Sequence, residues 1–116
     1  MRVYADLFKA LSDETRLAAL AMIMDHGELC VCDVEAVLAI TQSKASRHLR
    51  YLKNVGLLDD RRDGIWVHYR LPQKPTKEVA ALIGANRKLI EGLKDKELER
   101  KLKTWLADKD RCRSCC

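Results

Sequence analysis

Five cysteines carry most of the chemistry that this 116-residue sequence offers. They form two groups, a Cys-Val-Cys motif at Cys30 and Cys32 and a Cys-x-x-Cys-Cys motif at Cys112, Cys115 and Cys116. Deprotonated thiols bind soft metal and metalloid ions, and they are also readily oxidised. An odd number of cysteines cannot pair completely within one subunit. We therefore interpret them as ligands or redox-active thiols of a cytoplasmic protein rather than as structural disulfides.

Cys30 and Cys32 lie at the start of a helix that we expect from about Cys30 to Leu38. The positive end of the helix dipole favours the thiolate form of both side chains there. In a regular helix, however, residues two positions apart point about 200° away from each other. If both sulfurs bind one atom, we expect this first turn to unwind and the helix to be distorted.

The second cysteine group lies in the last seven residues, 110–116, where cysteine is the only apolar residue type. We expect a flexible, Cys-rich tail there, after one domain that spans residues 1–109. The three thiols of the tail could bind an ion by themselves, or they could lend one thiol to Cys30 and Cys32. A tail without a role in binding is the remaining alternative.

The chain around Cys30 and Cys32 has the pattern of a helix-turn-helix. The helix from Cys30 to Leu38 is followed by a second one that we expect from Gln42 to Val55. Thr41 is suited to cap this second helix, and Gly56 to end it, because glycine adopts a left-handed conformation at little cost. Two earlier helices are expected from apolar spacing, over about residues 3–11 and 13–24.

A hairpin is expected directly after these helices. Asp63-Gly64 separates two stretches, 57–62 and 65–71, and Asp-Gly accepts the dihedral angles of a tight turn. A hairpin in this position forms the wing of a winged helix-turn-helix, with Trp66 as a wing anchor. The fold class that we expect is therefore mainly α with a β-hairpin wing.

The last part of the chain has a long apolar stripe. Apolar residues recur every three to four positions from Val79 to Leu106, with a possible break at Gly92 or Asp95. Such a helix presents more apolar surface than a body of this size can cover. We predict a homodimer built on the first and last helices, with Trp105 at the interface.

The second helix of the helix-turn-helix separates polar from apolar side chains. Ala45, Leu49 and Leu52 form the apolar stripe. The predicted DNA-binding face consists of glutamine, serine and basic residues: Gln42, Ser43, Lys44, Ser46, Arg47, His48 and Arg50. Glutamine and arginine can make bidentate contacts to adenine and guanine, whereas other basic side chains suit phosphates. His48 either reaches a phosphate or packs half-buried against the wing. Arg61 and Arg62 would lie near the flanking minor groove.

The distribution of charge supports this prediction. The net charge is +5, and residues 41–70 contain seven Lys or Arg against three acidic residues, whereas residues 1–40 contain three against seven. A compact basic region suits a phosphate backbone, although a solvated helix face is the ordinary alternative. We see neither an apolar run of about 18 residues nor a catalytic set of side chains, so we expect neither a membrane protein nor an enzyme.

Several stretches resemble the ArsR/SmtB family of metal-responsive repressors, and in particular its arsenic-responsive branch. The similar stretches are Leu7 to Leu17, Leu29 to Asp33, Ser46 to Leu49, Gly56 to Leu58 and Gly64 to Leu71. The resemblance implies a dimeric winged helix that binds double-stranded operator DNA and dissociates when arsenite or antimonite binds to cysteine thiolates, with no organic cofactor. Cys30 and Cys32 match the first two positions of the branch's Cys-Val-Cys-x-x-Cys ligand set. Glu35 stands at the third, and a carboxylate is a poor ligand for a soft ion.

Two alternatives within the same fold stay open. The first is a sensor of cadmium or lead, although such relatives add cysteines from an N-terminal extension and no cysteine precedes Cys30. The second is a repressor that responds to thiol oxidation. A zinc sensor fits less well, because zinc-sensing relatives place histidine ligands on the last helix and residues 75–116 contain no histidine.

Overall fold

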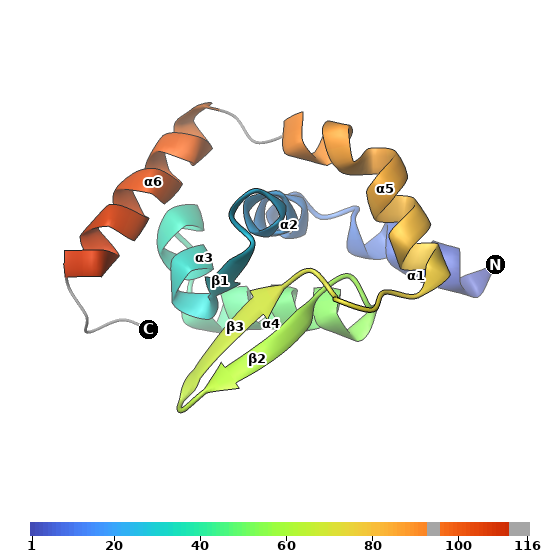
Figure 1. Ribbon diagram of the computed structural model, residues 1–116, viewed down its shortest axis with the longest axis horizontal. Coiled ribbons are helices and arrows are strands. Elements are labelled where there is room, and N and C mark those ends of the chain that lie inside the picture. Colours follow the sequence, from blue (N-terminus) through green and yellow to red (C-terminus); the bar gives the residue numbers. More distant parts are fainter. Residues whose placement is uncertain (93–95, 112–116) are drawn as a thin grey trace.

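The computed structural model of the chain describes residues 1–92 and 96–111. The elements follow in the order α1 (Arg2–Ala10), α2 (Glu14–His26), β1 (Glu28–Cys30), α3 (Val31–Leu38), α4 (Gln42–Asn54), β2 (Asp59–Asp63), β3 (Trp66–Arg70), α5 (Lys77–Gly92) and α6 (Lys96–Arg111). Figure 1 shows α2 in the middle, with α3 and α6 towards one side, α1 and α5 towards the other, and α4 with the sheet below. Over the described ranges, every helix is too short or too polar to cross a bilayer.

The central position of α2 follows from its sequence. Residues 19–24 are all buried, so this helix needs neighbours on every side. It begins at Asp13, whose carboxylate accepts a hydrogen bond of 3.0 Å from the backbone N–H of Arg16, as an N-cap should. Gly27 then takes a positive φ of 102°, which lets the chain leave the helix and enter β1.

The predicted helix-turn-helix consists of α3 and α4. Between them, Ala39 adopts a left-handed conformation, and the Thr41 hydroxyl caps α4 by accepting a hydrogen bond of 3.2 Å from the N–H of Lys44. Gly56, with φ of 88°, follows the end of α4. The apolar stripe of α4 is buried as expected: Ala45, Leu49 and Leu52. The helix and both of its predicted boundaries are therefore confirmed to within a residue.

The wing contains one strand more than the sequence indicated. β2 and β3 form the predicted hairpin, and β1 pairs with the other edge of β3, so that the antiparallel order is β1-β3-β2. His68 of β3 lies opposite Cys30 on one side and opposite Arg61 on the other. A strand of three residues is too short for an alternating pattern, which explains why it escaped prediction. Its pairing joins the residue before α3 directly to the wing.

The long helix predicted at the end of the chain is two helices, α5 and α6, and the predicted break at Gly92 or Asp95 matches the interval between them. α6 packs against α3, with Leu102 only 3% exposed. It continues to Arg111, past the predicted domain boundary at residue 109. Trp105, which we expected at a dimer interface, is half-buried and donates a hydrogen bond to Asp33 of its own chain.

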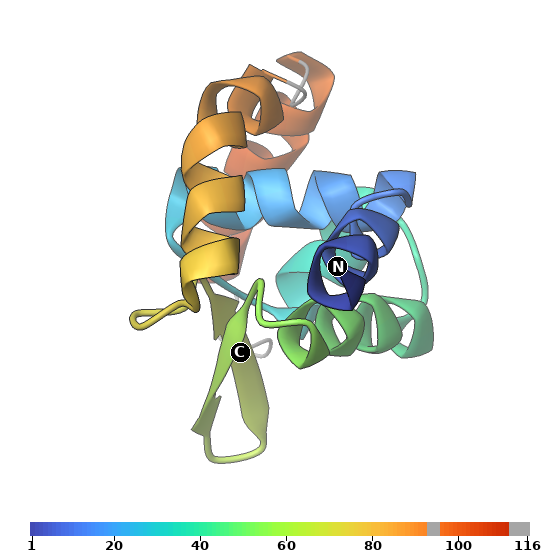
Figure 2. The same cartoon turned by 90° about the vertical axis from the view of Figure 1, so that its right-hand side faces the viewer.

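Large apolar side chains remain exposed on α1 and α5, which are in contact with each other. Val3, Tyr4 and Phe8 of α1 are 52%, 46% and 58% exposed, and Leu89 of α5 is 65% exposed. Among the residues whose spacing predicted α1, Leu7 and Ala10 are buried. Figure 2 views the molecule from the side on which these two helices lie. Within the described residues, no other part of the chain covers these side chains.

Candidate thiol site and nucleic-acid interface

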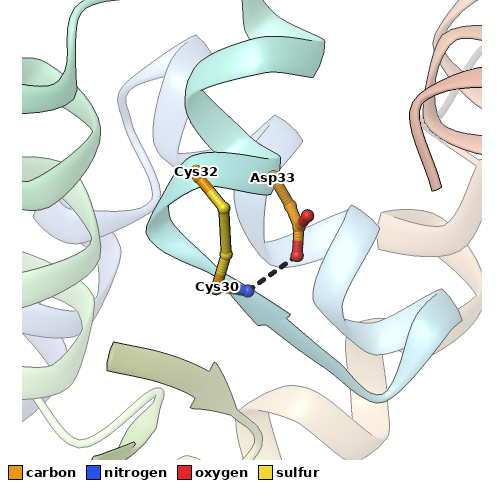
Figure 3. A group of neighbouring side chains, drawn as sticks. All are labelled: Cys30, Cys32 and Asp33. Atoms are coloured by element: carbon orange, nitrogen blue, oxygen red, sulfur yellow. Dashed lines mark hydrogen bonds between the residues drawn. A yellow bond between two sulfur atoms is a disulfide. The ribbon is translucent and has the colours of Figure 1, made fainter. Parts of the chain in front are cut away.

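Cys30 and Cys32 are brought together by the start of α3. Cys30 is the last residue of β1 and the N-cap of α3, with extended φ and ψ of −88° and 167°, while Cys32 lies in the first turn. Their Cα atoms are 5.4 Å apart and their sulfurs form a disulfide (Figure 3). The expectation that the helix must unwind is therefore wrong. Because an N-cap residue lies outside the helix, its side chain can fold back towards the first turn.

The disulfide joins residues only two positions apart. A loop this short removes little freedom from the unfolded chain, so the disulfide adds little to the stability of the fold. The pair is better described as two adjacent thiols in their oxidised form. Reduction would leave both sulfurs beside each other and available to one soft ion.

Asp33 completes this turn and was missed in the sequence. Its carboxylate is 2% exposed and accepts hydrogen bonds from the backbone N–H of Cys30, at 2.8 Å, and from the Trp105 indole, at 2.7 Å. The ligand atoms of Cys30, Cys32 and Asp33 lie within 4.8 Å of one another, as in a metal site. Each carboxylate oxygen already has a donor, however, so we assign Asp33 to holding the turn. Its position three residues after an N-cap, as in a capping box, was the available signal.

A pocket of about 250 Å³ lies beside Cys32. It is formed between α3, α4 and the wing, and it is lined by Val31, Cys32, Glu35, Gln42, Ser46, Ile65, Trp66 and Val67. Glu35, which stands where a third thiol was expected, belongs to this pocket. The same pocket contains two of the residues predicted to contact DNA. Cys32 and part of the predicted DNA-binding face therefore share one cavity.

The other predicted ligands, Cys112, Cys115 and Cys116, lie outside the described residues. The described chain ends at Arg111, the last residue of α6. A role for these three thiols stays a prediction.

The predicted DNA-binding face of α4 divides into exposed and half-buried residues. Ser46 and His48 are half-buried, whereas the other five are exposed: Gln42, Ser43, Lys44, Arg47 and Arg50. The exposed set lies opposite the buried stripe of the same helix. A row of polar and basic side chains on the exposed side of a helix-turn-helix is the arrangement that major-groove contact needs.

His48 faces inwards, against a residue that sequence reasoning did not single out. Its Nδ1 is 3.3 Å from the guanidinium of Arg16. The same guanidinium donates a hydrogen bond of 2.7 Å to the backbone carbonyl of Ala10, and it lies 4.2 Å above the centre of the Tyr51 ring. Arg16 thereby ties the turn between α1 and α2 to α4. Its backbone N–H also holds the pKa of Asp13 below the ordinary value. We assign His48 chiefly to this contact.

The two wing arginines differ in their surroundings. Arg61 and Arg62 are both exposed, but the guanidinium of Arg61 donates from Nε to Glu28 Oε1 at 3.1 Å, and from Nη2 to the same oxygen. His68 Nδ1 is 3.7 Å from that carboxylate. The hydrogen bond from Arg61 is the main reason that the pKa of Glu28 lies below its usual value. Glu28 thus pairs with one of the two wing arginines that we predicted to lie near DNA.

Together these features define a winged helix-turn-helix protein with a thiol pair beside its DNA-facing helix. Residues 13–60 match the family described as "Bacterial regulatory protein, arsR family". The arsenic resistance transcriptional regulator ArsR2 of Pseudomonas putida is 53% identical over 72 residues, which cover 61% of this chain and 63% of that protein. The arsenical resistance operon repressor of Escherichia coli is 55% identical over 65 residues, 56% of each chain.

A cadmium resistance transcriptional regulatory protein CadC homolog of Staphylococcus aureus is also similar, with 43% identity over 75 residues that cover 65% of this chain and 62% of that protein. The chain therefore spans less than two thirds of the length of these three curated relatives.

Two solved structures share the fold over most of their length. HlyU from Vibrio cholerae is 34% identical with a TM-score of 0.63, covering 76% of this chain and 91% of that one. The homodimeric winged helix-turn-helix DNA-binding domain of Mb0332 from Mycobacterium bovis is 27% identical with a TM-score of 0.61, covering 76% and 78%. The chain belongs to the arsR family of bacterial regulatory proteins, and the curated relatives described above are transcriptional regulators or operon repressors.

Proposed function

We propose that the protein is a transcriptional repressor that binds operator DNA through α4 and the wing, and that leaves the DNA when trivalent arsenic or antimony binds to Cys30 and Cys32. The observation that carries this proposal is the pocket in which Cys32 lies beside Gln42 and Ser46 of α4. A ligand on the thiol pair touches the surroundings of the DNA-facing residues directly. The arsenic-resistance relatives in Pseudomonas putida and Escherichia coli support the choice of ligand.

DNA binding rests on the exposed face of α4. Gln42 and Arg47 are suited to base edges, and Lys44 and Arg50 to phosphates. Replacing Arg47 by alanine should weaken binding to a selected DNA duplex by about 1–3 kcal/mol if the contact is bidentate. Arg100→Ala removes the same charge from an exposed position on α6 and serves as the matched control. Equal losses from both variants would contradict a specific role for α4.

Arsenite binding is a ligand exchange at the reduced thiol pair. A cellular dithiol reductant first supplies two electrons and two protons to the disulfide. Each thiol then forms one As–S bond, one As–O bond breaks, and the thiol proton leaves with that oxygen as water. Two waters are released for two thiols, and arsenic stays trivalent. Adjacent sulfurs favour this exchange because the second bond forms within one molecule.

Two structural links lead from the thiol pair to the DNA-binding surface. The first is the contact of α3 with α4, across which Cys32 and Glu35 share a pocket with Gln42. The second is the sheet, in which Cys30 pairs with His68 of the wing strand β3. A ligand that moves this turn therefore acts on α4 and on the wing together. It needs to favour only a conformation that no longer fits the major groove.

A homodimer is the assembly that we propose. The helix α1 exposes Val3, Tyr4 and Phe8, its neighbour α5 exposes Leu89, and the Mycobacterium bovis domain of the same fold is homodimeric. Two copies related by a twofold axis would bury these side chains isologously. They would also present two α4 helices to two half-sites of DNA.

Inorganic arsenite has a third bond to satisfy, and we propose that the C-terminal thiols Cys112, Cys115 and Cys116 can supply it. Glu35 is a poor substitute because its carboxylate is a hard ligand. α6 supports this proposal, since it is tied to α3 through the contact of Trp105 with Asp33 and ends one residue before Cys112.

The deciding experiment measures release from DNA. A duplex selected by the reduced protein from a random pool is titrated with arsenite, and the same is done with Cys30→Ser and Cys32→Ser. Both variants should bind the duplex as the wild type does and should no longer be released. A variant with serine at residues 112, 115 and 116 is the matched control and should still be released, at higher arsenite concentration. Normal release of both single variants would overturn the proposal.

A second candidate function is favoured by the disulfide between Cys30 and Cys32. Oxidation itself would then trigger release, because a bond between the sulfurs constrains the same turn on which a ligand would act. In this case hydrogen peroxide, which takes two electrons from the dithiol and yields water, releases the DNA without any metalloid. Cadmium, suggested by the Staphylococcus aureus relative, is tested in the same titration.

A further inference from the structure

The pocket beside Cys32 has an apolar wall that inorganic arsenite would not use. The wing contributes Ile65, Trp66 and Val67 to this wall, and Ile65 is 85% exposed. The opposite wall is polar, with Glu35 and Ser46 among its residues. An exposed branched side chain at the edge of a pocket that also contains a thiol is suited to an apolar group held by that thiol.

The geometry of the thiol pair directs a bound atom towards this pocket. Cys30 is fully buried, whereas Cys32 is half-buried and lines the pocket. On the other side of the turn, both oxygens of Asp33 already accept hydrogen bonds, and Trp105 of α6 lies against it. Figure 3 shows the sulfurs on one side of the turn and the Asp33 carboxylate on the other. An arsenic atom bonded to both sulfurs would therefore lie at the wall of the pocket that Cys32 forms, where an organic substituent on arsenic has room.

We propose that this pocket binds the organic substituent of a trivalent organoarsenical, in which arsenic carries one alkyl or aryl group. The proposal rests on arsenic binding by the thiol pair and names the ligand class. With one As–C bond in place, arsenic needs two more bonds, which Cys30 and Cys32 supply. The exchange releases two hydroxyl groups as water with the two thiol protons, and the As–C bond stays intact. A third thiol at the position of Glu35 is then not needed.

The size of the pocket suits such a group. A cavity of roughly 150 Å³ accommodates a benzene ring in other proteins, and this pocket measures about 250 Å³. A ring in this position would contact Ile65 and Val67 on the wing and approach Gln42 and Ser46 on α4. It would occupy space between the two elements that contact DNA. An organoarsenical should therefore release DNA at lower concentration than arsenite does.

The test compares phenylarsine oxide with arsenite on the full chain, reduced with a phosphine and free of DNA. Each affinity is measured by competition with dithiothreitol, which offers two thiols without a pocket. Relative to dithiothreitol, the chain with serine at residues 112, 115 and 116, in which arsenite finds no third thiol, should favour the phenyl compound over arsenite by about tenfold, which corresponds to roughly 1.4 kcal/mol. Ile65→Ser should remove most of this preference and leave arsenite affinity within about twofold. Ile65→Val, which keeps the wall apolar, should retain it.

The outcomes separate this proposal from the one on which it rests. If neither arsenical binds the thiol pair, the proposed function itself fails. If both bind, and Ile65→Ser lowers neither affinity or lowers both equally, the pocket has no part in recognition and the inference is overturned. Loss of phenylarsine oxide preference in Ile65→Ser alone, with release of DNA by arsenite unchanged, supports the organoarsenical site.

Discussion

The indole Nε1 of Trp105 donates a hydrogen bond of 2.7 Å to Oδ1 of Asp33, a buried carboxylate 72 positions earlier in the chain. The other oxygen of Asp33 accepts from the backbone N–H of Cys30. One carboxylate therefore fixes the turn that holds the thiol pair and also ties α6 to it. Because neither partner of this contact lies in α4 or the wing, it can be altered without touching the predicted DNA-binding face.

The first prediction concerns the stability of this link. Trp105→Phe keeps an aromatic ring but removes the donor, so that a buried oxygen of Asp33 loses its partner. Such a loss costs about 1–3 kcal/mol, and we expect the free energy of unfolding in urea to fall by about this amount. In a double-mutant cycle with Asp33→Ala, the two changes should be coupled by at least about 0.5 kcal/mol. Strict additivity would argue against the link.

The second prediction concerns the ion pair between Glu28 and Arg61. Glu28→Gln removes a negative charge beside the wing and frees the guanidinium for phosphate. We expect tighter DNA binding at low salt and a slope of log K against log salt that steepens by about one. Glu97→Gln removes the same charge from an exposed position on α6 and should change neither the affinity for DNA at low salt nor the slope. An unchanged slope in Glu28→Gln would mean that Arg61 does not meet the DNA.

The third prediction is the pH dependence of the same pair. The hydrogen bond from Arg61 holds the pKa of Glu28 below its ordinary value of 4.5 in the folded protein. Because the folded-state pKa is the lower one, the contribution to stability is fully present above pH 4.5 and is lost as the pH falls through the folded-state pKa. The difference in thermal midpoint between wild type and Glu28→Gln should therefore be present at neutral pH and vanish in acid. A difference that persists in acid would point to packing instead of charge.

Much of the fold could be predicted because its signals are local. Thr41 and Gly56 bound α4, and Asp13 starts α2, since caps and glycine turns depend only on neighbouring residues. The pairing of β1 with β3 and the contact of Trp105 with Asp33 were not predictable, because each joins residues far apart in the sequence. The thiol pair was found from spacing alone. Its geometry was not, because the end of β1 removes Cys30 from the helix.

The fourth prediction tests the dimer. Phe8→Glu places a charge among the exposed apolar side chains of α1, where burial against a second copy would be unfavourable. We expect dissociation to monomers in analytical ultracentrifugation and weaker DNA binding. Ile65→Glu is the matched control, since it changes an apolar residue that is 85% exposed, against 58% for Phe8, and that lies on the wing, away from α1. It should leave the dimer intact. A wild type that sediments as a monomer at micromolar concentration would remove the dimer proposal.

The fifth prediction counts the sulfur atoms around arsenic by X-ray absorption. Trp105 is held against Asp33, and six helical residues from Trp105 to Arg111 span about 9 Å, so the chain leaves α6 within reach of α3. With arsenite, we expect three sulfurs in the full chain, and two sulfurs with one oxygen after removal of residues 112–116. With phenylarsine oxide, whose As–C bond takes the third place, we expect two sulfurs in both proteins. Removal of the tail should accordingly weaken the binding of arsenite and leave the binding of phenylarsine oxide unchanged. If the full chain gives only two sulfurs with arsenite, the tail has no place in the site, and Cys30 and Cys32 bind arsenic alone.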